Sequence, residues 1–74
     1  MNHYLVVFDR SKGRVTHHKL YADRDEALAA RFAAEREHSN EPEIEIVVLG
    51  ARSWADVQRT HGRYFKGFEQ LAAG

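Results

Sequence analysis

The sequence predicts a small α+β fold with the element order β-β-α-β-α, in which both helices pack on a three-stranded mixed sheet of order 2-1-3 as a two-layer sandwich. Three observations predict it. Residues 4–8 are apolar on both faces of a strand, residues 24–38 form an alanine-rich helix, and an apolar stripe with helical spacing begins at Trp54. With 74 residues and no cysteine, the chain is expected to form one domain over residues 1–74.

Composition and charge exclude several classes of function. The 11 basic and 11 acidic residues cancel, so no chain-wide charge attracts nucleic acid or anionic lipid. No apolar run approaches the roughly 20 residues that cross a bilayer, and residues 1–20 carry no signal-peptide pattern, so we expect a cytoplasmic protein without a membrane partner. The charge is uneven, at +3 over residues 1–22, −5 over 23–45 and +2 over 46–74, which favours self-complementary contacts.

The first two strands are expected over residues 3–10 and 14–21. The first strand is apolar on both faces and therefore central, whereas the second is more polar, as an edge strand should be. Gly13 can adopt a positive φ in the turn that joins them. With a two-residue turn, the register pairs His17 with Phe8 and His18 with Val7.

The first helix is expected over residues 24–38. Asp23 and Glu26 stand three residues apart, which is an Asp variant of the capping box. Leu28 and Phe32, at i and i+4, are its expected apolar anchors on the sheet. Pro42 ends the helical region because it disfavours helix at the residue before it.

A third strand is expected over residues 43–49, ended by Gly50, and a second helix over residues 54–72. Ser53 is the expected N-cap of that helix. A break near Gly62 is the alternative to a continuous helix, since glycine weakens a helix by about 1 kcal/mol relative to alanine. The element order resembles ferredoxin-like and dimeric α+β-barrel architectures, a likeness of layout that implies no activity.

One face of the central strand is left to be covered after the first helix packs on the other. Either the second helix crosses it, or a second copy of the chain packs against it. We favour a homodimer because a short chain without disulfides has little else with which to cover that face. The expected dimer face comprises Leu5, Val7, His18 and Leu20.

The residues that carry chemistry form no recognised motif. His17 and His18 are adjacent on a strand and point to opposite faces, so they cannot share a metal ion. No histidine spacing typical of a metal site, nucleophile motif or phosphate-binding glycine loop occurs, so we expect neither metal nor cofactor. The leading hypothesis is therefore a non-catalytic interaction or regulatory domain whose partner is itself.

Two alternatives stay open. His61 lies on the apolar stripe of the second helix and could act as a general base in a pocket with Tyr64, Trp54 and an acid, either Asp56 or Glu69. The second alternative is a nucleic-acid-binding regulator, because arginine beside aromatic residues suits phosphate contact and base stacking. Its basic residues are Arg52, Arg59, Arg63 and Lys66.

Overall fold

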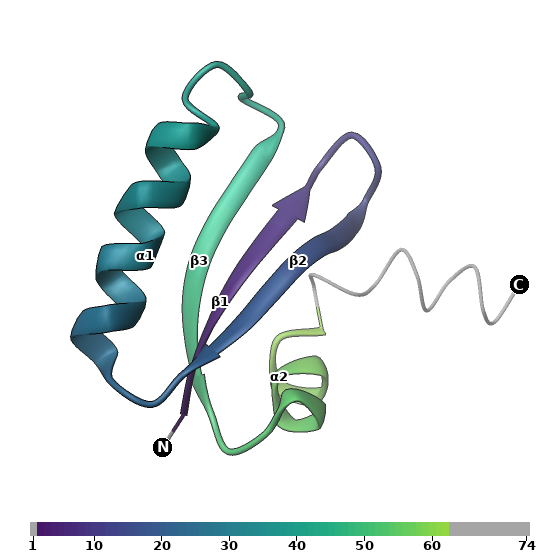
Figure 1. The fold of residues 1–74 in the computed structure, drawn as a ribbon. Helices are drawn as coiled ribbons and strands as arrows, with labels where there is room; N and C mark the ends of the chain where they lie inside the picture. Colours follow the sequence, from purple (N-terminus) through teal and green to yellow (C-terminus); the bar gives the residue numbers. More distant parts are fainter. Residues whose placement is uncertain (1, 63–74) are drawn as a thin grey trace, which may run out of the picture.

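The computed structural model describes residues 2–62 as three strands and two helices (Figure 1). The elements in chain order are β1 (Asn2–Asp9), β2 (Arg14–Tyr21), α1 (Arg24–Glu37), β3 (Ile44–Ala51) and α2 (Trp54–Thr60). This is the predicted α+β element order. Strand β3 runs two residues beyond the expected end, because Gly50 pairs with His3 and continues the ladder.

The sheet has the predicted strand order β2-β1-β3, with β1 in the centre. Both neighbouring pairs are antiparallel, and Val6 lies opposite His18 on one side and Val47 on the other. The expectation of a mixed sheet was wrong in this respect: β2 and β3 run in the same direction, but β1 separates them, so every ladder in the sheet is antiparallel.

The β1–β2 hairpin differs from the expected register by two residues beside the turn and by one residue on the other side of a bulge. Val7 pairs with His17, and the register then shifts so that Phe8 pairs with Val15. The turn spans four residues because the carboxylate of Asp9 accepts hydrogen bonds from the Ser11 backbone N–H at 2.9 Å and the Ser11 hydroxyl at 2.6 Å. Gly13 completes the turn at φ 66°. This wider turn and the bulge place His18 opposite Val6 rather than Val7.

Each face of β1 is buried by a different helix. Leu5 and Val7 pack with Ile46 beneath α1, and we call this side of the sheet the α1 face. Tyr4 and Val6 pack with Val57 of α2, and we call this side the α2 face. The sheet therefore lies between the two helices, rather than carrying both on one side as a two-layer sandwich would.

Helix α1 meets the sheet with its alanines. Ala27 is 0% exposed, and Ala30 and Ala34 pack on the core of the α1 face. The expected anchor Phe32 is instead 58% exposed. Since a helix turns about 100° per residue, Phe32 lies about 200° from Ala30 and Ala34 and points away from the sheet. The small side chains let the helix backbone approach the strands closely.

The helix N-termini follow the predicted positions, with one difference. Ser53 caps α2 as expected, because its hydroxyl accepts a hydrogen bond from the Asp56 backbone N–H at 3.1 Å. Asp23 is the N-cap of α1, but its side chain makes no capping hydrogen bond. Helix α2 ends at Thr60, ahead of Gly62. The remainder of the expected second helix, residues 63–72, lies outside the described residues.

Candidate functional site

An aromatic cluster links α2 to the sheet on the α2 face. Trp54, the first residue of α2, stacks on His18 of β2 with ring centroids 3.7 Å apart and planes 7° apart. Trp54 also contacts Tyr4 of β1, with ring centroids 5.6 Å apart and planes 49° apart. Because the Ser53 cap fixes where α2 begins, it also fixes the position of the indole ring over these two strands.

An apolar surface adjoins this cluster on the α2 face. Leu20 lies directly opposite Tyr4 on β2, and its side chain is 51% exposed. Val15, Val47 and Leu49 pack against the core of this face and are themselves only half-buried. Leu20 and these half-buried side chains together form an apolar surface beside the aromatic cluster.

The four residues of the expected dimer face lie on two different faces. Leu5 and Val7 are 5% exposed beneath α1 and are not available to a partner. His18 and Leu20 are exposed on the α2 face. The physical reason is the one-residue change in hairpin register, since a shift of one residue moves every side chain of a strand to the other face.

His61, the expected general base, is half-buried at the C-terminus of α2. Its backbone N–H donates to the Val57 carbonyl at 2.8 Å and so closes the last turn of the helix. Of the acids considered as its partner, Asp56 is engaged by Arg59. Tyr64 and Glu69 lie outside the described residues, so the structure assembles no acid–base constellation around His61 within residues 2–62.

Two of the four basic residues considered for nucleic-acid binding lie near the start and end of α2. The Arg59 guanidinium is ion-paired with the carboxylate of Asp56, which also accepts a hydrogen bond from the Arg52 backbone N–H at 3.3 Å. The hydrogen bond from Arg59, followed by that from Arg52, holds the pKa of Asp56 below its usual range. This acid offsets part of the positive charge, while Arg63 and Lys66 lie outside the described residues.

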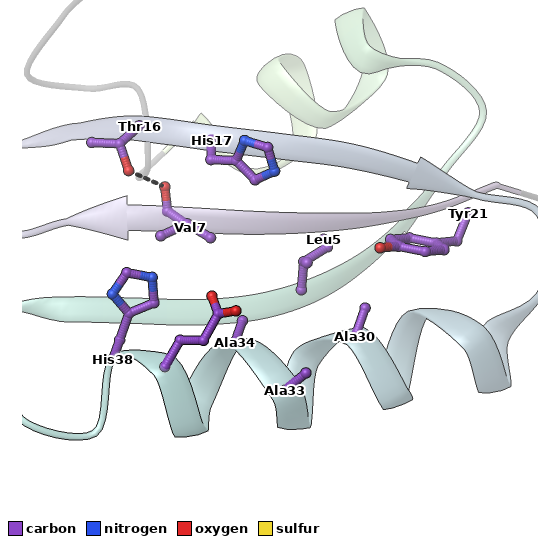
Figure 2. A pocket seen from close by; sticks show the side chains of 10 residues that line it. Leu5, Val7, Thr16, His17, Tyr21, Ala30, Ala33, Ala34 and His38 are labelled. Atoms are coloured by element: carbon purple, nitrogen blue, oxygen red, sulfur yellow. Dashed lines mark hydrogen bonds between the residues drawn. The ribbon is translucent and has the colours of Figure 1, made fainter.

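A groove of about 480 Å³ opens on the α1 face, between α1 and β2 (Figure 2). Its floor is formed by Leu5 and Val7 of β1. Its helix wall is formed by Ala30, Ala33 and Ala34, whose small side chains leave the space unfilled. Figure 1 shows the origin of the groove: α1 lies along the β3 side of the sheet, so the β2 side of this face is left open.

Polar side chains from both walls border this groove. His17 projects from β2 and His38 from the end of α1, on opposite sides of Val7 (Figure 2). The Thr16 hydroxyl donates to the Val7 carbonyl at 3.4 Å, and Glu37 lines the same end. Tyr21 closes the other end (Figure 2).

His38 has a defined orientation because its Nδ1 lies 2.8 Å from Oε1 of Glu41. The sequence interpretation missed this pair. Its available signal was the i, i+3 spacing of a histidine and a glutamate immediately after a helix, which is too common to distinguish from a chance surface contact.

Comparisons with known proteins assign no family to this chain. No protein-family model matches, and neither the search of curated proteins nor that of solved structures gives a significant match. Neither helix in residues 2–62 has the length and hydropathy of a membrane span. The same part of the chain holds no group of three histidine, aspartate or glutamate residues placed to bind a metal ion.

Proposed function

We propose that this protein is a non-catalytic interaction domain that forms a homodimer through the α2 face of its sheet. The observation that carries the proposal is Leu20, whose side chain is 51% exposed beside the half-buried Val15, Val47 and Leu49. The α1 face has its own helix over Leu5 and Val7, so the α2 face is the one that offers apolar surface to a second copy.

The charge distribution on β2 suits a two-fold contact on this face. Residues paired across an antiparallel ladder share a face, and the bulge beside Val7 offsets the alternation along β2. Val15, His18 and Leu20 therefore share the α2 face, whereas Arg14 and Lys19 lie opposite Asp9 and Leu5 on the α1 face. A two-fold axis near Leu20 therefore brings no formally charged β2 side chain against its own copy. Like charges at a two-fold contact would otherwise oppose dimerisation.

The size of the chain supports the same proposal. A domain of 74 residues buries a smaller fraction of its surface than a larger domain does, and this one has no cysteine to add a covalent link. Sharing the α2 face with a second copy would add apolar burial without adding chain. We propose the cytoplasm as its compartment, because a domain without cysteine has no need of an oxidising environment.

Sedimentation of the full chain at micromolar concentration tests the dimer. We expect the wild type to sediment as a dimer and Leu20→Lys as a monomer. Phe32→Lys is the matched control, since Phe32 is the other exposed large apolar side chain within residues 2–62 but lies on the outer side of α1. A wild type that stays monomeric at every accessible concentration overturns the proposal, and so does a dimer that Phe32→Lys disrupts and Leu20→Lys does not.

The two alternative functions gain no support from the described contacts. Arg59 of α2 is ion-paired with Asp56, and Arg52, which precedes α2, donates only its backbone N–H to that carboxylate. Within residues 2–62, the His61 side chain makes no hydrogen bond or ion pair with an acid or a tyrosine. Both alternatives stay predictions from the sequence.

A further inference from the structure

We propose that the groove between α1 and β2 binds a small primary amine carried on a flat apolar body. This site lies on the α1 face, on the opposite side of the sheet from the proposed dimer contact. It therefore adds a ligand site to the interaction domain and does not depend on the dimer.

The groove has the size and lining of a small-molecule site. Its volume of about 480 Å³ falls within the roughly 300–1,000 Å³ of typical ligand pockets. Leu5 and Val7 form an apolar floor beside an alanine wall, so an aromatic or short aliphatic body would be desolvated on two sides. The groove is open along its length, which suits a flat body rather than a bulky one.

His38 presents a hydrogen-bond acceptor to this groove. In the neutral form of the His38 ring, Nδ1 carries the proton, because the carboxylate of Glu41, 2.8 Å away, can only accept a hydrogen bond. Nε2 is then the acceptor. It lies on the side of the ring away from Glu41, and the His38 ring borders the groove (Figure 2). A ligand head that donates a hydrogen bond suits this nitrogen.

The same end of the groove has further acceptors and a negative charge. Thr16 directs its hydroxyl hydrogen to the Val7 carbonyl, which leaves its oxygen lone pairs as acceptors. Glu37 contributes a carboxylate to the lining. Lys19 lies over the ring of Tyr21, at the other end of the groove, with its Nζ 5.2 Å from the centroid. Arg14 is on the same face as the groove, where it stands opposite the carboxylate-bearing Asp9. Charge and hydrogen bonding together favour an ammonium head at the His38 end.

The test compares two probes of matched shape in an NMR titration of the ¹⁵N-labelled full chain. Phenethylamine has an ammonium head, and 3-phenylpropanoate has a carboxylate on the same phenylethyl body. We expect saturable shifts at Val7, Thr16 and Ala34 with phenethylamine, at an affinity about tenfold higher than that of the carboxylate. Equal or tighter binding of 3-phenylpropanoate overturns the proposal, and so does the absence of saturable shifts with the amine.

Two variants locate the site. Glu37→Gln should weaken amine binding about threefold to fivefold, since it removes one exposed charge from the groove. Glu26→Gln is its control, because it removes the same charge from the first turn of α1 and should leave the affinity unchanged. Ala33→Leu should abolish binding by filling the groove. Amine shifts that survive Ala33→Leu, or a Glu26→Gln effect equal to that of Glu37→Gln, overturn the assignment.

The groove and the dimer can fail separately. The same titration on the Leu20→Lys variant, which alters only the α2 face, should give the wild-type amine affinity. Loss of binding in that variant would show that the site is not the groove between α1 and β2 of a single chain.

Discussion

The imidazole ring of His18 lies flat against the indole ring of Trp54, with centroids 3.7 Å apart. This contact joins the edge strand β2 to α2, a helix of seven residues. Helices of this length are marginal in water, so tertiary contacts must hold α2 in place. The stack, the Tyr4–Trp54 contact and the buried Val57 supply those contacts.

His18→Ala should lower the free energy of unfolding by about 1 kcal/mol, because it removes one stacked pair and leaves the indole ring partly unsupported. His17→Ala is the matched control, since His17 is the next residue on the same strand and points to the other face. Chemical denaturation at one fixed protein concentration measures both. If both variants lose the same free energy of unfolding, the loss comes from placing alanine in β2, and the stack on Trp54 contributes no stability.

Asp9 organises the hairpin turn, and its substitution should shift the denaturation midpoint. Its carboxylate accepts hydrogen bonds from Ser11 and from the Lys12 backbone N–H, the latter at 3.2 Å. Asp9→Ala removes every acceptor and should lower the midpoint. Asp9→Asn keeps one side-chain oxygen and should retain most of the stability at neutral pH. If Asp9→Ala matches the wild type, the turn does not depend on this carboxylate.

The same carboxylate predicts a dependence of stability on acid. The hydrogen bond from the Ser11 hydroxyl, with those from the backbone of Lys12 and Ser11, holds the pKa of Asp9 below its ordinary value of 3.8. A carboxyl whose pKa is lower in the folded state binds its proton more readily when unfolded. Its contribution is therefore complete above pH 3.8 and is lost as the pH falls from there through the lowered pKa.

The free energy of unfolding, measured at a series of acid pH values, should fall with pH in the wild type and should fall less in Asp9→Asn. Part of the slope should persist in the variant, because the pKa of Asp56 is lowered as well, mainly by the hydrogen bond from Arg59. An Asp9→Asn variant with an unchanged slope would contradict the assignment to Asp9.

Gly13 is required by the backbone of the hairpin turn. Its φ of 66° lies in the left-handed region, where a side chain costs about 1–2 kcal/mol. Gly13→Ala should lower the free energy of unfolding by that amount, although a methyl group there meets no neighbouring atom within 4 Å. Gly62→Ala offers the comparison, since that position is equally open and its φ lies outside the left-handed region. Thermal unfolding of the two variants separates backbone strain from crowding.

The sequence was sufficient for the strand order and insufficient for the hairpin register. An apolar residue at every position of 4–7 can only be buried between two layers, which places β1 in the centre. The register depends instead on how Asp9 and Ser11 close the turn and on the bulge beside Val7. The alternation of hydrophobic residues does not predict such local hydrogen bonds. Because the predicted register was wrong, the expected dimer face combined Leu5 and Val7 of the α1 face with His18 and Leu20 of the α2 face.

The candidate groove could not be predicted from the sequence, because it also depends on how the elements pack together. It forms where α1 leaves the β2 side of the sheet open, and helix placement is a property of the packed fold. From the sequence, histidines are candidate site residues because of their chemistry. Among the five, His61 is favoured because it lies in the apolar stripe of the second helix. His38 is oriented by Glu41 at the end of α1, and no stripe or motif marks this pair in the sequence.

The helix face provides the last prediction, because sequence and structure disagree on which side of α1 meets the sheet. Large apolar residues suggested Leu28 and Phe32, whereas the structure buries Ala27 completely and leaves Phe32 58% exposed. Ala27→Leu should then lower the free energy of unfolding by about 1–3 kcal/mol, since the added atoms have no space between α1 and the sheet. Phe32→Ala should change it by no more than about 0.5 kcal/mol.

Chemical denaturation of these two variants decides between the two helix faces. If Phe32 were the anchor, its truncation would cost several times more than the enlargement of Ala27, since loss of a buried phenylalanine costs about 3–5 kcal/mol. Phe32→Lys, the control in the sedimentation experiment, should behave like Phe32→Ala, because a charged side chain is tolerated only where the position faces water. A strongly destabilised Phe32→Lys would place this side of α1 against the sheet, and would overturn the packing of the alanine face on the strands.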